Sequence, residues 1–215
     1  MIIDMHVHSQ ASDDAGASVE AYLRWAQNLR KHYCLDGLVL TEHRKYQIGA
    51  EYDELAREFN LLILKGAEVE TNYGHFLLYG ISEEVLSQFD FSRTDLNAKT
   101  LLEKVVSTSG IMVPAHPGRE TVGLCDYLPQ VGDELKGIRV IEQLNGANKP
   151  PENLRAVELA RRKNYFGIGG SDAHYVTSLG TCLTRFKNSI SNMNQLVTEL
   201  YKGDYWPIYL DEVKI

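Results

Sequence analysis

Histidine and carboxylate side chains are concentrated at a few points along this chain of 215 residues. Six of its seven histidines lie in five short polar segments beside apolar runs, namely His6, His8, His43, His75, His116 and His174. Asp13, Glu68 and Asp172 lie in or beside similar segments. Imidazole nitrogen and carboxylate oxygen are ligands for borderline divalent ions such as zinc, manganese and iron. Because nine candidate ligands exceed the four of one tetrahedral site, the sequence predicts two or three ions with a bridging carboxylate.

The spacing within these segments favours ligands carried on strands. Three pairs are two residues apart: His6 and His8, Glu68 and Glu70, and Asp172 and His174. Residues i and i+2 of a strand lie on one face, so both members of a pair can reach the same ion. One histidine at a strand end is more often a hydrogen-bonded core or rim residue, but that interpretation does not explain the whole set. The seventh histidine, His32, is expected on a solvated helix surface.

The elements that must position these residues follow from alternating apolar runs and helical periodicity. Strands are predicted near residues 1–7, 38–43, 61–70, 74–80, 111–115, 137–146 and 165–174, and helices near 18–29, 50–60, 97–110, 150–164 and 193–203. Ser18 is a candidate helix cap, and Gly110 is a candidate stop. The "TNYG" segment at 71–74 suits a tight turn, so we expect a hairpin that returns His75 to Glu68.

This alternation predicts an α/β protein with a mostly parallel sheet, either open or closed into a barrel. In barrels of this kind the active site forms at the carboxyl ends of the strands, where most of the histidine segments fall. His75 is the exception, because it begins its strand. No linker, low-complexity tract or solenoid-scale repeat interrupts the chain, so we expect a single domain over residues 1–215.

Composition excludes some partners and leaves others open. The hydrophobic content of 44% fits one globular domain, and no apolar run approaches the roughly 20 residues that span a bilayer. Three cysteines, Cys34, Cys125 and Cys182, form no C-x-x-C pair, which is typical of reduced thiols in a cytoplasmic protein. We expect neither a membrane partner nor a signal peptide. The net charge of −7 argues against binding of nucleic acid through general electrostatic attraction, without excluding a local positive site.

The polar segments occur in an order that resembles a known family. "DMHVHS", "TEH", "GAEVE", "GHFLLYG", "AHPGR" and "GSDAH" follow one another as in the PHP (polymerase and histidinol phosphatase) family. An H-x-H pair alone is common, whereas six segments in order are specific, and the resemblance extends from Asp4 to about His174. It implies a distorted (β/α)7 TIM-like barrel with a cluster of usually three ions at the strand carboxyl ends. Members of the family include phosphomonoesterases and nucleases.

Carried over residue by residue, the resemblance implies three groups of ligands. One ion would be held by His6, His8, Glu68 and Asp172, a second by Glu68, His75 and His116, and a third by Asp13, His43 and His174. The sequence has Ser12-Asp13-Asp14 where the family commonly has Ser-Asp-Gly, which leaves Asp14 as an alternative to the preferred Asp13. Glu42, where the family often has Asp, is not expected to be a ligand.

Such a cluster would suit chemistry on phosphate. Three divalent ions and three carboxylates would leave a formal charge of about +3, so an acidic protein could present a positive pocket to a phosphate dianion. A water shared by two ions, held as a bridging hydroxide, would attack phosphorus. Arg119 is the best donor to phosphate because its planar fork suits bidentate binding, and Arg44 and Lys45 are further candidates. By analogy with related hydrolases, Asp172 would take the proton of the attacking water. Two residues at the end of the 137–146 strand are candidates for orienting a ligand histidine: Glu142 and Asn145.

The main hypothesis is a metal-dependent phosphoesterase that hydrolyses a small phosphomonoester or nucleotide. A nuclease acting on short oligonucleotides is an alternative, disfavoured by the net charge and by the lack of a basic tract with interleaved aromatic residues. Hydrolysis of a C–N or C–O bond by the same kind of water is another. A non-catalytic metal-binding module would be marked by lost ligands, and none is missing. The sequence leaves the substrate and the oligomeric state open.

Overall fold

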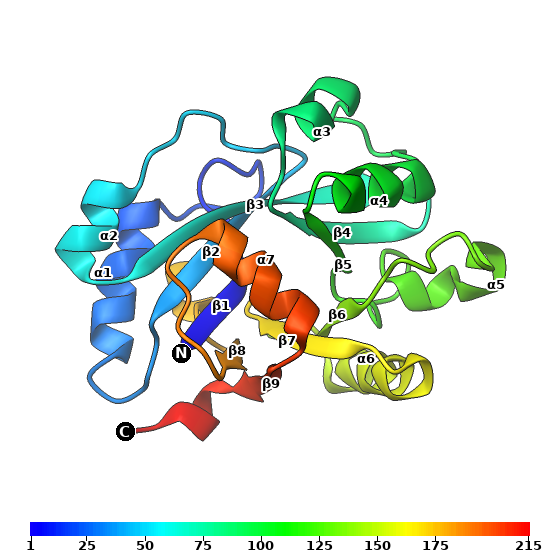
Figure 1. The fold of residues 1–215 in the computed structure, drawn as a ribbon. Coiled ribbons are helices and arrows are strands. Elements are labelled where there is room, and N and C mark those ends of the chain that lie inside the picture. The colour runs from blue at the N-terminus through cyan, green and yellow to red at the C-terminus, as the bar shows by residue number, and fades with distance from the viewer.

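The computed structural model describes residues 1–215 as an α/β fold built on a curled sheet (Figure 1). Seven strands hydrogen-bond in the order β5-β4-β3-β2-β1-β8-β9. They are β1 (Ile2–Val7), β2 (Gly37–His43), β3 (Leu62–Thr71), β4 (Gly74–Tyr79), β5 (Ile111–Pro114), β8 (Cys182–Phe186) and β9 (Tyr205–Tyr209). A separate pair, β6 (Val140–Asn145) and β7 (Phe166–Gly170), packs between β5 on one side and β1 and β8 on the other. The sheet therefore curls around a common interior.

Seven α-helices connect and cover the strands. They are α1 (Val19–Leu29), α2 (Asp53–Phe59), α3 (Glu83–Gln88), α4 (Ala98–Ser107), α5 (Leu128–Val131), α6 (Pro150–Lys163) and α7 (Met193–Lys202). Four of them begin at a polar cap, where Ser18, Ser82, Asn97 and Asn192 accept a hydrogen bond from the backbone N–H three residues on. α6 begins with two prolines, whose fixed φ suits a first helical turn. All five predicted helices are confirmed, and no helix has the length and apolar character needed to cross a membrane.

The sheet is buried on both faces. Successive residues of β2 alternate between two apolar clusters: Leu38 and Leu40 pack with α1, whereas Val39 packs with Leu196 and Leu200 of α7. Figure 1 shows α7 lying across the concave side of the curled sheet. Both faces of the strand are thus removed from water, which explains why its sequence is a continuous apolar run and not an alternating one.

The predicted α/β class is confirmed, but the sheet is not mostly parallel. Three pairings are parallel (β1 with β2, β2 with β3, β6 with β7) and four are antiparallel (β1 with β8, β3 with β4, β4 with β5, β8 with β9). One antiparallel pair is the hairpin expected at "TNYG", in which Glu70 lies opposite His75. The strands β8 and β9 were not predicted, because both are short and follow the last histidine segment. A regular alternation of seven strands and seven helices is therefore not the architecture of this chain.

Glycines allow β7 to approach β1 and β8 closely. A Cβ on Gly169 would lie 2.4 Å from the carbonyl oxygen of Leu183, and a Cβ on Gly170 would lie 2.4 Å from the Cβ of His6. Just beyond β7, the N–H of Asp172 donates to the carbonyl of His6 at 2.8 Å. The close approach of these backbones thus brings the carboxyl ends of β1 and β7 side by side.

Replacing Gly169 tests this packing. We expect Gly169→Ala to lower the free energy of unfolding by about 1–3 kcal/mol, because the added methyl group collides with backbone that cannot move aside. Gly16→Ala is the matched control, since no atom lies within 4 Å of the position of its added Cβ. Urea unfolding of both variants measures the difference, and equal midpoints for the two would show that β7 does not need a glycine here.

Candidate metal centre

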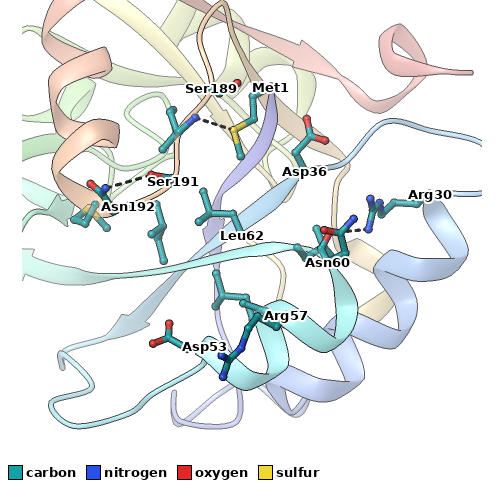
Figure 2. A pocket seen from close by; sticks show the side chains of 16 residues that line it. Met1, Arg30, Asp36, Asp53, Arg57, Asn60, Leu62, Ser189, Ser191 and Asn192 are labelled. Carbon is teal, nitrogen blue, oxygen red and sulfur yellow. Dashed lines mark hydrogen bonds between the residues drawn. The ribbon is translucent and has the colours of Figure 1, made fainter.

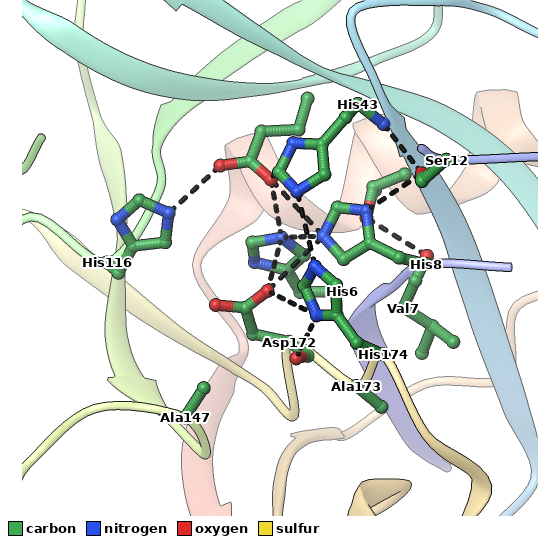
Figure 3. A network of polar contacts seen from close by, with 12 residues as sticks. His6, Val7, His8, Ser12, His43, His116, Ala147, Asp172, Ala173 and His174 are labelled. Carbon is green, nitrogen blue, oxygen red and sulfur yellow. Dashed lines mark hydrogen bonds and ion pairs between the residues drawn. The ribbon is translucent and has the colours of Figure 1, made fainter. Parts of the chain in front are cut away.

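The predicted ligands meet at the carboxyl ends of the strands (Figure 3). Three groups of side chains each have ligand atoms within 4.8 Å of one another: His6, His8, Glu68 and Asp172; Glu68, His75 and His116; and His8, His43 and His174. The first group is buried in full, and the other two groups include half-buried histidines. Eight of the nine predicted ligands therefore lie in one cluster, and the groups overlap through Glu68 and His8.

Glu68 occupies the centre of the cluster, and its two oxygens face different groups. Oε2 lies 3.1 Å from Nε2 of His6 and 3.2 Å from Nε2 of His8. Oε1 lies 3.0 Å from Nδ1 of His75 and 2.9 Å from Nε2 of His116. A carboxylate that directs one oxygen to each of two ligand groups has the geometry needed to bridge two ions. The hairpin between β3 and β4 is what returns His75 to this position.

The ninth predicted ligand, Asp13, lies elsewhere, and its neighbour takes its place. The side chain of Asp13 is 78% exposed and pairs with Arg44 at 2.7 Å. Oδ2 of Asp14 lies 3.5 Å from Nε2 of His43 and 3.4 Å from Nε2 of His174. The geometry therefore favours the alternative, Asp14, as the carboxylate beside these two histidines. Adjacent residues of a turn point in different directions, and only the fold decides which carboxylate faces the histidines.

A buried carboxylate orients two of the histidines from behind. Oε1 of Glu142 lies 2.9 Å from Nδ1 of His6, and Oε2 accepts a 2.6 Å hydrogen bond from the backbone N–H of His116. Nδ2 of Asn145 donates to the same Oε2 at 2.9 Å. This contact orients the ring of His6 so that Nε2 faces the cluster. The predicted orienting role of Glu142 and Asn145 agrees with these contacts.

Glu42 also supports the cluster without being a candidate ligand, as expected. Its carboxylate accepts hydrogen bonds from the hydroxyls of Ser9 at 2.5 Å and Ser12 at 2.6 Å. The Ser12 hydroxyl oxygen in turn accepts from the backbone N–H of His43 at 2.9 Å. These contacts fix the loop after β1 against the end of β2. Nothing in the sequence marks the two serines except their place beside the H-x-H pair.

The donor set fits divalent cations. The Nε2 atoms of His6 and His8 lie 2.9 Å apart, and the same two atoms lie 3.5 and 3.3 Å from Oδ1 of Asp172. Imidazole nitrogens and carboxylate oxygens thus converge on one small volume. Such a volume is unfavourable when empty of positive charge and favourable around an ion. The mixture of nitrogen and oxygen donors suits zinc, manganese or iron.

Charges within the cluster displace the pKa values of its members. Burial alone would raise the pKa of Glu68, but His6 and the other surrounding imidazoles outweigh it and hold that pKa well below the usual range. The pKa of Asp172 is likewise well below its usual range, where His6 and a hydrogen bond from His8 outweigh burial. Burial lowers the pKa of His43 to about 4, so this imidazole is neutral at physiological pH. The carboxylates are thus ionised and ready to bind cations.

Three basic residues were predicted to contact substrate, and they occupy different surroundings. Nη2 of Arg119 donates to Oδ2 of Asp172 at 2.7 Å and to the side-chain oxygen of Asn145 at 2.9 Å, which places this arginine beside the cluster. Arg44 is held by two carboxylates, and Lys45 donates to the carbonyl oxygen of Ala11 at 2.5 Å. Arg119 therefore contacts a member of the ligand cluster, Asp172, whereas Arg44 contacts Asp13, which lies outside the cluster.

The backbone is strained where it enters the site. Arg44, His116 and Asp172 have φ values of +53°, +29° and +53°, although none is a glycine. Each follows the carboxyl end of a strand, respectively β2, β5 and β7. Side chains rarely adopt this region, and such residues cluster at functional sites where surrounding contacts fix the conformation. Three of them around one ligand cluster therefore support a functional role for this end of the sheet.

A large cavity lies at the opposite end of the strands and lacks such chemistry. Figure 2 shows this cavity of about 1040 Å³ beside Met1, Asp36 and Leu62, near the amino ends of β1, β2 and β3. No group of candidate metal ligands lies there. Its size therefore does not make it the catalytic site, and the ligand cluster remains the better candidate.

Comparisons with known proteins agree with this fold and cluster. A family model described as PHP-associated matches residues 150–205, which include Asp172 and His174. An uncharacterized protein of Methanocaldococcus jannaschii is 24% identical over 194 residues, covering 86% of this chain and 70% of that protein.

Two solved structures share the fold at low identity. A two-domain protein of Bacteroides vulgatus, described as containing a predicted PHP-like metal-dependent phosphoesterase, is 20% identical with a TM-score of 0.65. That match covers 98% of this chain and 65% of the Bacteroides protein, so the chain spans slightly less than two thirds of its length. The lesion-specific endonuclease PfuEndoQ of Pyrococcus furiosus is 16% identical with a TM-score of 0.65, covering 96% of this chain and 58% of that protein.

The motif order, the PHP-associated segment and the shared fold are independent observations that agree. The segment ends in β8 and α7, which complete the sheet and its interior, and it supplies two of the ligands in the cluster. The comparisons thus support the resemblance to the PHP family at the level of the fold and of a PHP-associated segment at residues 150–205.

Proposed function

We propose that this protein is a metal-dependent phosphoesterase that hydrolyses a small phosphomonoester or nucleotide. The observation that carries the proposal is the set of three overlapping ligand groups joined through Glu68. The similarity to the Bacteroides protein described as a PHP-like metal-dependent phosphoesterase supports the same reaction class. The complete set of donors disfavours a non-catalytic module, in which ligands would have been lost.

The ligand groups assign residues to two or three ions. His6, His8, Glu68 and Asp172 would hold the first, and Glu68, His75 and His116 would hold the second. His43 and His174 would hold the third together with Asp14, in place of the Asp13 expected from the motif. Glu68 belongs to two of these groups, so its removal would affect both.

Bound ions would lower the pKa of water and neutralise charge that develops on phosphate oxygens. With three ions and the carboxylates of Glu68, Asp172 and Asp14, the site would carry a formal charge of about +3. This local charge would attract a phosphate dianion to a chain whose net charge is −7. A small substrate suits such a protein, because its recognition needs no extended basic surface.

Asp172 and Arg119 are the residues we assign to the reaction beyond ligation. Oδ1 of Asp172 faces His6 and His8, while Oδ2 is held by Arg119. This carboxylate is therefore fixed where it can accept a proton from the attacking water. Nη1 of Arg119 makes no hydrogen bond within the protein, which leaves its two hydrogens free to bind a phosphate oxygen.

Endonuclease activity is the second candidate, and the shared fold of PfuEndoQ favours it. This chain covers 58% of that enzyme, so parts of the endonuclease have no counterpart here. The net charge also weighs against a long nucleic-acid track. A nucleotide or short oligonucleotide would satisfy the same cluster.

A substrate panel tests the proposal. Metal-free protein would be reconstituted with zinc, manganese or iron(II) and assayed on sugar phosphates, nucleoside monophosphates and short oligonucleotides. We expect release of inorganic phosphate from at least one monoester, and protein kept metal-free by chelation is the control. Cleavage confined to oligonucleotides would favour the nuclease, and no turnover with any of the metals would refute both activities.

Glu68→Gln tests the shared carboxylate. Glutamine has a similar shape but lacks the charge that faces two ligand groups, so we expect bound metal to fall to at most one ion per chain and turnover to fall at least about 100-fold. The matched control is Glu199→Gln, another buried carboxylate, which contacts Lys202 and Asn188 outside the cluster. Elemental analysis of purified protein measures the metal. Normal metal content in Glu68→Gln would rule out its central role.

Metal binding should release protons. In the metal-free protein burial lowers the pKa of His6, but Glu142 and the other nearby carboxylates outweigh burial and raise that pKa well above the usual 6.5. The proton must leave before Nε2 binds an ion, so metal affinity falls as the pH falls. The raised pKa also stabilises the metal-free fold below pH 6.5, and this contribution is lost as the pH rises through the raised value. Zinc calorimetry in two buffers of different ionisation enthalpy measures the release, and identical heats would contradict it.

A further inference from the structure

Arg44 joins the loop after β1 to the middle of the sheet. Its guanidinium lies 2.7 Å from Oδ2 of Asp13 in that loop and 2.9 Å from Oε1 of Glu70 at the end of β3. Asp13 is the neighbour of Asp14, whose carboxylate faces His43 and His174. We propose that Arg44 is a positioning residue that holds Asp14 at the third ligand group, and not a contact for substrate. This inference rests on the third ion of the proposed function.

The guanidinium has little freedom left for a substrate phosphate. It is 34% exposed, and carboxylates occupy both Nη1 and Nη2. A phosphate at Arg44 would have to displace two anionic partners and would then lie beside their negative charges. Arg119, whose Nη1 is free, does not meet this obstacle. The surroundings of Arg44 thus favour a structural contact over substrate binding.

The backbone of Arg44 is set for this contact. Its φ of +53° belongs to the left-handed region, and its N–H donates to the carbonyl of Glu68 at 2.7 Å. Immediately before it, the N–H of His43 donates to the hydroxyl of Ser12. The chain therefore turns sharply where β2 ends, and from that turn the side chain of Arg44 reaches the same loop that Ser12 anchors.

The loop needs a tether because its acidic residues are exposed. The side chains of Asp13 and Asp14 are 78% and 58% exposed, so apolar packing does not fix them. Backbone contacts bracket the pair: Ser12 is bound at its hydroxyl, and the N–H of Gly16 donates to the carbonyl of His174 at 3.2 Å. Between these points, the pair of Asp13 with Arg44 is a side-chain contact that connects the turn to the end of β2, beside the longer contact of Asp14 with His43.

Arg44 could affect the third ion in two ways, and these predict opposite changes in ion affinity when Arg44 is replaced. As a nearby cation it would repel a divalent ion, so removing its charge would strengthen ion binding. As a positioning residue it holds a ligand in place, so its removal would weaken ion binding. The direction of the change therefore separates positioning from simple electrostatics, without any measurement of turnover.

The experiment titrates metal-free protein with zinc and compares variants. Arg44→Asn removes the charge, and asparagine adopts positive φ more readily than other substitutes. We expect the third zinc to bind about tenfold more weakly, the first two to bind as before, and amide hydrogen exchange at residues 13–15 to accelerate. Arg44→Lys keeps one positive charge but cannot span both carboxylates, so it should weaken the third zinc by a smaller factor. Arg24→Asn, which removes an exposed ion pair with Glu20, is the matched control.

The outcomes separate this inference from the proposed function. Unchanged or tighter binding of the third zinc in Arg44→Asn, with unchanged exchange, would overturn the positioning role while leaving the phosphoesterase proposal intact. If the Asn variant fails to fold, the same criterion applies to Arg44→Lys. A wild-type chain that binds only two zinc ions would overturn both the third group and this inference, while phosphate release in the substrate panel would still support the first two groups.

Discussion

The structure depends on the burial of one carboxylate. Glu68 is 1% exposed, and an ionised carboxylate so far from water costs several kcal/mol unless positive charge or hydrogen-bond donors surround it. Four strand ends supply what it needs: β1 and β2 contribute His6 and His43, β4 carries His75 as its second residue, and His116 follows β5. The fold can therefore be understood as the arrangement of strands that brings imidazoles to this oxygen pair.

A second layer of buried carboxylates makes the arrangement rigid. Glu142 and Glu42 are both 0% exposed, and neither is in a ligand group. Glu142 connects the ring of His6 to the backbone of His116, and Glu42 connects Ser9 to Ser12. Glu142 thus joins two segments that are distant in sequence, and Glu42 holds the loop after β1. These contacts fix both the orientation of the His6 ring and the path of the loop after β1. The side chains that face the centre therefore do not have to be ordered when an ion binds.

Local patterns made much of this structure predictable. The i, i+2 spacing of His6 and His8, the helix caps and the "TNYG" turn depend on residues close in sequence, and the structure has each of them. The antiparallel return of β8 and β9 depends on pairing between the two ends of the chain, which short apolar strands do not specify. Asp14, and not Asp13, faces the histidines, while Asp13 pairs with Arg44, a residue about thirty positions away in the sequence. Strand pairing and the direction of these side chains thus depend on contacts between residues that are distant in sequence.

The order in which the ligands occur along the chain has a consequence for biosynthesis. The group that contains His6 and His8 is complete only when Asp172 is present, and β1 pairs with β8, which follows later still. Under the proposed function, a ribosome that synthesises the chain from its amino terminus would expose His6 and His8 long before Asp172 emerges. A metal ion bound during that interval would have an incomplete set of donors. Correct loading with metal would therefore come at the last stage of synthesis, when the closing strands have left the ribosome.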